Sequence, residues 1–134
     1  MTNAVILAVA LAVGHHSEQA RWAALSLVES GNRDTAHGRS GEISRWQILR
    51  REWRRATAMP VSAATNAVTA RTVCEAVMAE RVLRFELKRQ RQPSDREWAY
   101  LWHCPSHVAH PRKDEREYAD RFEAAVVRLV KKMK

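Results

Sequence analysis

One carboxylate stands at the end of an apolar helical stretch. The run from Ala24 to Val28 is mostly apolar, Glu29 follows it, and Gly31 marks the end of the predicted helix. The partial negative charge of a helix C-terminus and apolar neighbours both favour the protonated carboxylic acid. Such an acid could protonate a glycosidic oxygen as a general acid. The position alone also fits an ordinary solvated glutamate.

Two further acids lie in the loop that follows. Asp34 and Glu42 are candidates for a second carboxylate, which in an inverting glycosidase activates water from roughly 6.5 to 9.5 Å away from the acid. The alternative is that both are solvated loop acids, or that Glu42 pairs with Arg45, because loop charges rarely do more.

The order of residues around Glu29 resembles a known pattern. The run Glu29-Ser30-Gly31-Asn32, then Gly41, then Ser44-Arg45-Trp46-Gln47-Ile48 is similar to the motifs of soluble lytic transglycosylases, which belong to the lysozyme-like superfamily. The later run Ala99 to Pro105 resembles that family's Ala-x-x-Tyr-Asn-Ala-Gly-Pro segment. The resemblance covers the chain from about Trp22 to the end.

This resemblance implies a lysozyme-like domain with an active-site cleft that cuts the β-1,4 bond between N-acetylmuramic acid and N-acetylglucosamine. Glu29 would be catalytic, and no cofactor or metal is expected. The muramoyl 6-hydroxyl would attack to give a 1,6-anhydro sugar, or water would attack if a second carboxylate serves. The implied substrate-binding residues are Ser30, Ser44, Trp46, Gln47, Tyr100, Trp102 and His103.

The sequence departs from the family pattern at two places. Ser44 stands where a glycine is common, and Trp102 and His103 replace the tyrosine and asparagine. These changes leave open an altered substrate preference or a catalytically inactive glycan-binding module. Trp46 is the best candidate to stack on a sugar ring, whereas Trp22, Trp53 and Trp98 are expected to pack between helices.

Helical periodicity and caps predict an all-α class with a long central helix, and no strand-like alternation of useful length occurs. Gly31 to Gly41 is rich in turn-forming residues and is predicted to be a loop. The expected helices are Ser17 to Gly31, Trp46 to Arg55, Asn66 to about Arg89, Arg96 to Cys104 and Asp114 to Lys134.

The charge points to an anionic partner. The chain has 134 residues, enough for one domain that we place at residues 15–134, and a formal net charge of +8. Peptidoglycan and other anionic wall polymers would complement this positive charge. The basic runs 45–55 and 88–91 could instead contact nucleic acid, but no helix-turn-helix or similar motif accompanies them, so no nucleic-acid partner is expected.

The first 14 residues hold ten consecutive small or apolar residues, Ala4 to Val13, too few for a membrane span. A signal peptide fits this segment and would export the protein to the periplasm or outside the cell, although no Lys or Arg precedes the apolar run. The alternative is an apolar segment that packs on the domain.

The two cysteines, Cys74 and Cys104, allow one disulfide in an exported protein or two buried thiols. His103, Cys104, His107 and His110 could also hold a transition metal, but no Cys-x-x-Cys pair supports that interpretation.

Overall fold

The computed structural model describes residues 14–132, and all of its regular structure is helical. This confirms the all-α class, since this part of the chain has no strand and only an isolated bridge between Ile43 and Ile48. The elements are α2 (Glu18–Ser30), α3 (Arg50–Ala56), the 3-10 helix η1 (Val61–Thr65), α4 (Ala67–Arg89), α5 (Asp95–His103), the 3-10 helix η2 (Pro105–His107) and α6 (Lys113–Lys132).

The predicted signal peptide, residues 1–14, lies outside the described residues except for Gly14. Among the helices of residues 14–132, none combines the length and the apolar character that crossing a membrane requires.

The expected helix starts are explained by their caps. The Ser17 hydroxyl accepts a hydrogen bond from the backbone of Ala20 at 3.2 Å, and Asn66 accepts one from Thr69 at 3.0 Å. Ser94 and Glu97 form a reciprocal capping box at the start of α5. Polar side chains at these positions satisfy amide groups that the first helical turn cannot pair, which is why the sequence located α2, α4 and α5 within about one residue.

One predicted helix start was wrong. The helix expected from Trp46 begins only at Arg50, because Ile43 and Ile48 exchange two backbone hydrogen bonds of 2.9 Å and close a turn between them. The backbone of Gln47 in this turn has φ of 55°, which a right-handed helix does not allow. The connection between α2 and α3 therefore extends to Leu49, and the two 3-10 helices were also not predicted.

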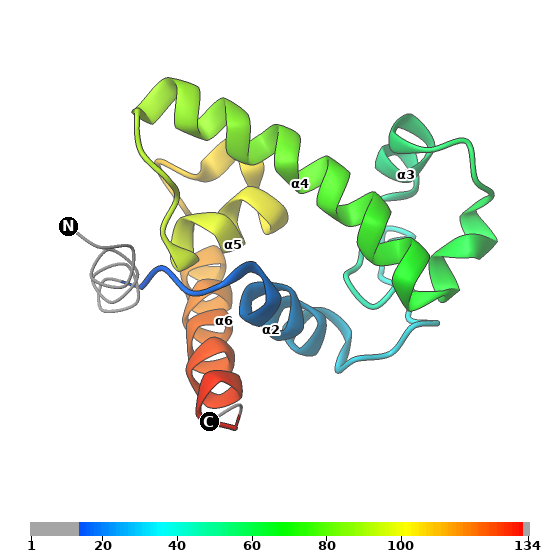
Figure 1. Ribbon diagram of the computed structural model, residues 1–134, viewed down its shortest axis with the longest axis horizontal. Helices are drawn as coiled ribbons and strands as arrows, with labels where there is room; N and C mark the ends of the chain where they lie inside the picture. Colours follow the sequence, from blue (N-terminus) through cyan, green and yellow to red (C-terminus); the bar gives the residue numbers. More distant parts are fainter. Residues whose placement is uncertain (1–13, 133–134) are drawn as a thin grey trace, which may run out of the picture. The chain divides into compact units, whose positions relative to one another are not determined.

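The chain divides into two compact units, with the boundaries inside α2 and α4. The single lysozyme-like domain stays a prediction. In the first unit, which includes described residues 14–24 and 82–132, α5 packs against α6 (Figure 1). Trp98 meets Trp22 edge-on at 5.1 Å and stacks on Phe122 at 5.7 Å, and all three side chains are buried. This aromatic core confirms the packing predicted for Trp22 and Trp98.

A buried carboxylate anchors the start of α2 in this unit. Asp95 accepts hydrogen bonds from Arg21 at 2.7 Å and from the backbone of His16 at 2.8 Å, and its other oxygen lies 2.6 Å from the His16 ring. Because a buried charge is costly unless it is paired, these contacts fix residues 16–21 against α5.

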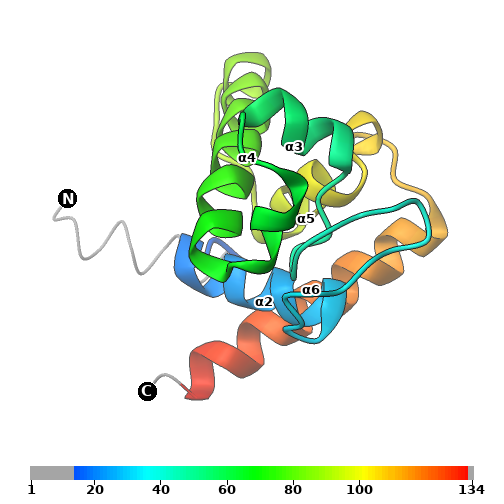
Figure 2. The same ribbon diagram turned by 90° about the vertical axis from the view of Figure 1, so that its right-hand side faces the viewer.

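The second unit, Leu25–Arg81, contains the long loop 31–49, drawn as a teal tube in Figure 2, and α3. The Trp53 ring is fully buried, as predicted, and its Nε1 donates to the Met59 carbonyl at 3.0 Å. Glu52 of α3 pairs with Arg81 of α4 at 2.6 Å. These two contacts hold α3 in place and give the loop a fixed end.

Candidate functional site

The predicted site residues fall in both units. Tyr100, Trp102 and His103 belong to the first unit. The second unit contains the end of α2 and the loop after it, with Glu29, Ser30, Asp34, Glu42, Ser44, Trp46 and Gln47. Glu29 is half-buried and is the penultimate residue of α2. The elements that position it are therefore the last turn of α2 and the loop.

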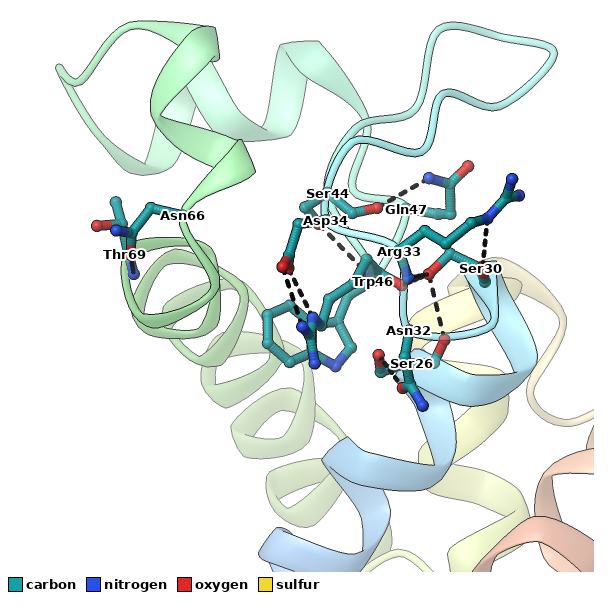
Figure 3. Close-up of polar contacts among 11 residues, drawn as sticks. Ser26, Ser30, Asn32, Arg33, Asp34, Ser44, Trp46, Gln47, Asn66 and Thr69 are labelled. Carbon is teal, nitrogen blue, oxygen red and sulfur yellow. Dashed lines mark hydrogen bonds and ion pairs between the residues drawn. The ribbon is translucent and has the colours of Figure 1, made fainter.

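Ser30 joins these two elements. Its hydroxyl donates to the Arg45 carbonyl at 2.8 Å and accepts from the Arg33 backbone at 3.0 Å (Figure 3). Only 8% of Ser30 is exposed. Ser30 was predicted to line a sugar-binding groove, and in the structure its hydroxyl instead forms buried contacts that hold the residue after Glu29 to the loop.

Asp34 and Arg45 form a two-bond ion pair across the loop. Arg45 Nε lies 2.7 Å from Asp34 Oδ1, and its other nitrogen lies 3.0 Å from Oδ2. These hydrogen bonds with Arg45 lower the pKa of Asp34 and raise that of Arg45. Asp34 is thus held ionised, with both oxygens engaged.

Ser44 begins the turn at residues 44–47 in an unusual backbone conformation. Its φ is 71°, the left-handed region that favours glycine, and its side chain is buried. The hydroxyl accepts a hydrogen bond from the Trp46 backbone at 3.1 Å, and the carbonyl accepts one from Gln47 Nε2 at 2.9 Å. The structure thus explains why a glycine would suit this position.

The side chains of Gln47 and Glu42 form hydrogen bonds within the outer part of the loop. Gln47 Nε2 also donates to the Ala36 carbonyl at 3.1 Å, and Glu42 Oε1 accepts from the Ser40 backbone at 3.1 Å. A Cβ at Gly38 would collide with the Glu42 carboxylate and approach Gln47 Oε1 to 2.7 Å. A larger residue at position 38 would therefore have to displace the ends of these two side chains. Glu42 does not pair with Arg45, whose acidic partner is Asp34.

Trp46 is buried, with 4% exposed, and Arg45 lies over its ring at 5.6 Å. A ring this deeply buried has no open face for a sugar, so the expectation that Trp46 stacks on a glycan does not agree with the structure. The sequence could not distinguish the two uses, because an aromatic ring serves equally as core and as stacking surface.

Two of the three candidates in the first unit are buried, and the third, His103, is an exposed residue whose ring stacks on a neighbour. Tyr100 is buried and its hydroxyl accepts from Arg96 Nε at 3.1 Å, while Trp102 meets Trp22 edge-on at 5.5 Å. The His103 ring stacks on Tyr118 with centroids 3.9 Å apart, and its partial loss of hydration lowers its pKa. A neutral imidazole is favoured there.

Two residues of the loop, Arg33 and Asn32, were given no role in the sequence analysis. Arg33 Nε donates to the Ser30 carbonyl at 2.9 Å, and Asn32 Oδ1 accepts from the Ser26 hydroxyl at 2.7 Å. Asn32 has φ of 66°, and asparagine tolerates this conformation better than most residues. An asparagine directly after Gly31, which ends the helix, was the sequence signal that could have predicted a second residue in the left-handed conformation.

Both cysteines are buried free thiols, so the disulfide alternative is wrong in this structure. Burial raises the pKa of each to about 12. Within residues 14–132, no three His, Cys, Asp or Glu side chains gather in a way that could hold a metal ion.

Comparisons of this chain with protein-family models, with curated proteins and with solved structures gave no match.

Proposed function

We propose that this protein cleaves peptidoglycan glycan strands at the bond between N-acetylmuramic acid and N-acetylglucosamine, with Glu29 as the general acid. The proposal rests on the sequence resemblance and on the local structure around Glu29. Because peptidoglycan lies outside the cytoplasm, the proposal includes export directed by residues 1–14. The net charge of +8 would favour approach to an anionic wall.

The observation that carries the proposal is the hydrogen bond between Ser30 and the Arg45 carbonyl. It connects the residue after Glu29 to the turn that contains Ser44 and Gln47. Two parts of the pattern that resembles the family, the run around Glu29 and the turn at residues 44–47, are thus connected within one unit. The φ of 71° at Ser44, where the family commonly has glycine, is a second point of agreement.

The chemistry favoured is that of a single carboxylate. Both oxygens of Asp34 are engaged by Arg45, and the resulting low pKa makes it a poor base. The Glu42 carboxylate points back to its own loop, where it accepts a hydrogen bond from the Ser40 backbone and lies against Gly38. A mechanism in which the substrate's own 6-hydroxyl attacks needs neither acid to activate water, so a lytic transglycosylase is preferred to an inverting hydrolase.

The test is the release of soluble fragments from purified peptidoglycan. Glu29→Gln should lose about 100-fold or more of the rate, because the amide cannot donate a carboxylic proton to the leaving oxygen. Glu75→Gln is the matched control, a helical glutamate of the same unit that pairs with Arg71. Undiminished release by Glu29→Gln, or no release by the unmodified protein, would contradict the proposal.

A further inference from the structure

We infer that the exposed arginines of α3 form a binding surface for the oxyanion groups, carboxylate or phosphate, of the cell-wall polymer. This surface consists of Arg51, Arg54 and Arg55. The choice of the wall as partner rests on the proposed function, whereas the surface itself follows from the structure of the second unit.

Some arginines of this unit have an acidic or carbonyl partner and others have no acidic partner. Arg45, Arg71 and Arg81 pair with Asp34, Glu75 and Glu52 respectively. Arg33 and Arg50 donate to the carbonyls of Ser30 and Gly41 at 2.9 Å. Arg51, Arg54 and Arg55 are exposed, and within residues 14–132 none has an acidic partner at salt-bridge distance.

The helical spacing places these three arginines on one side of α3. Residues three and four positions apart share a helical face, so Arg51 neighbours both Arg54 and Arg55. The only acid of α3, Glu52, is turned to Arg81, and Trp53 is buried. Nothing on α3 therefore neutralises this face, and the mutual repulsion of its cations would be relieved by a bound anion.

Arginine is suited to carboxylates and phosphates because its planar group can donate two parallel hydrogen bonds. Both anions occur in bacterial walls, on peptide stems and on phosphodiester polymers. α3 directly follows the turn that contains Gln47, with only Ile48 and Leu49 between them. Contacts at α3 would thus hold the polymer beside the loop of the proposed site.

A single-stranded nucleic acid is the less favoured polyanion. Single-strand binding uses exposed aromatic rings as stacking platforms, but Trp46 and Trp53 next to these arginines are 4% and 0% exposed. The surface offers cations without a ring to stack on a base.

The test measures binding to purified wall sacculi by co-sedimentation, with Glu29→Gln as the background so that the wall is not consumed. The combined change Arg51→Gln, Arg54→Gln and Arg55→Gln should raise the apparent Kd about tenfold at low salt, since three exposed ionic contacts are lost, and should flatten its salt dependence. The control changes the exposed Lys113, Arg128 and Lys131 of α6 to Gln and removes the same charge. It should change Kd less than about twofold if local contacts, not net charge, decide binding.

Two treatments of the wall identify the anion. Removing the phosphodiester polymers abolishes the effect of the α3 variant if phosphate is bound, and amidating the carboxyl groups abolishes it if carboxylate is bound. Equal weakening by the α6 control, no effect of the α3 variant, or insensitivity to both treatments would overturn the inference. If duplex DNA bound more tightly than the wall sacculi, and this binding depended on the α3 arginines, the partner of this surface would be nucleic acid and not the wall. The assay measures binding and needs no cleavage. Loss of binding by the α3 variant can therefore be told apart from a lack of the proposed cleavage activity.

Discussion

The Ser30 hydroxyl donates a 2.8 Å hydrogen bond to the carbonyl of Arg45, fifteen residues away in the sequence. Since Ser30 also accepts from the Arg33 backbone, one buried side chain fixes both the exit from α2 and the turn that precedes α3. The position of Glu29 relative to the loop of its own unit depends on this serine.

Replacing Ser30 by alanine should lower the free energy of unfolding by about 1 to 2 kcal/mol, because a buried donor and acceptor lose their partner. The proposed cleavage activity should fall as well, since the loop is no longer tied to the helix end. Urea unfolding and fragment release measure the two effects. Ser62→Ala, at an exposed position, is the control and should stay within about 0.5 kcal/mol. An unchanged stability of Ser30→Ala would contradict this role.

Ser44 offers a comparison of two substitutions. Both Ser44→Gly and Ser44→Ala remove the hydroxyl that accepts from the Trp46 backbone, but only alanine keeps a Cβ at φ of 71°. Ser44→Gly should therefore be more stable than Ser44→Ala by about 1 kcal/mol. Chemical denaturation of the two variants measures this difference directly. Equal stability would mean that the left-handed backbone at residue 44 carries no strain.

Glu97 should give stability that depends on pH. Two hydrogen bonds from Arg91 at 2.7 and 2.8 Å, with those of the Ser94 cap, lower the pKa of Glu97 to about 2. Because the folded-state pKa lies below the ordinary value of 4.5, the stabilisation is complete above that value and is lost as pH falls towards about 2.

Glu97→Gln should accordingly cost about 1 kcal/mol or less at neutral pH, because the glutamine oxygen can still complete the capping box and only the charge and the ion pair with Arg91 are lost. Its unfolding free energy should also vary less between pH 4.5 and 2 than that of the unmodified protein. Thermal unfolding across this range is the measurement, with the exposed Glu117→Gln as control. Parallel pH profiles for Glu97→Gln and the unmodified protein would refute the assignment.

Local signals in the sequence predicted the helices well. Ser17, Asn66 and Ser94 each provide a side-chain oxygen for an unpaired amide of the first turn, and this chemistry is visible in the sequence. Gly31, with φ of 64°, likewise ends α2 as expected. These features depend on neighbours within about four residues, so they do not require knowledge of the tertiary structure.

The loop 31–49 was harder to predict because its structure comes from longer-range contacts. The pairing of Ile43 with Ile48 and the left-handed Ser44 and Gln47 displaced the predicted start of α3. The Asp34–Arg45 pair spans eleven residues and could not be chosen over a Glu42–Arg45 pair from sequence. Burial of Trp46 was likewise invisible, since aromatic residues suit both a core and a binding surface.

Mass spectrometry of the muropeptides released from purified peptidoglycan would show whether Glu29 acts as the single catalytic carboxylate. We expect fragments that end in 1,6-anhydro-muramoyl groups, formed by the unmodified protein and missing with Glu29→Gln. Asp34→Asn should keep the same product type, because Arg45 already occupies the Asp34 carboxylate. Reducing-end fragments that disappear with Asp34→Asn or Glu42→Gln would contradict the one-carboxylate mechanism, and anhydro products that persist in Glu29→Gln would contradict the role of Glu29.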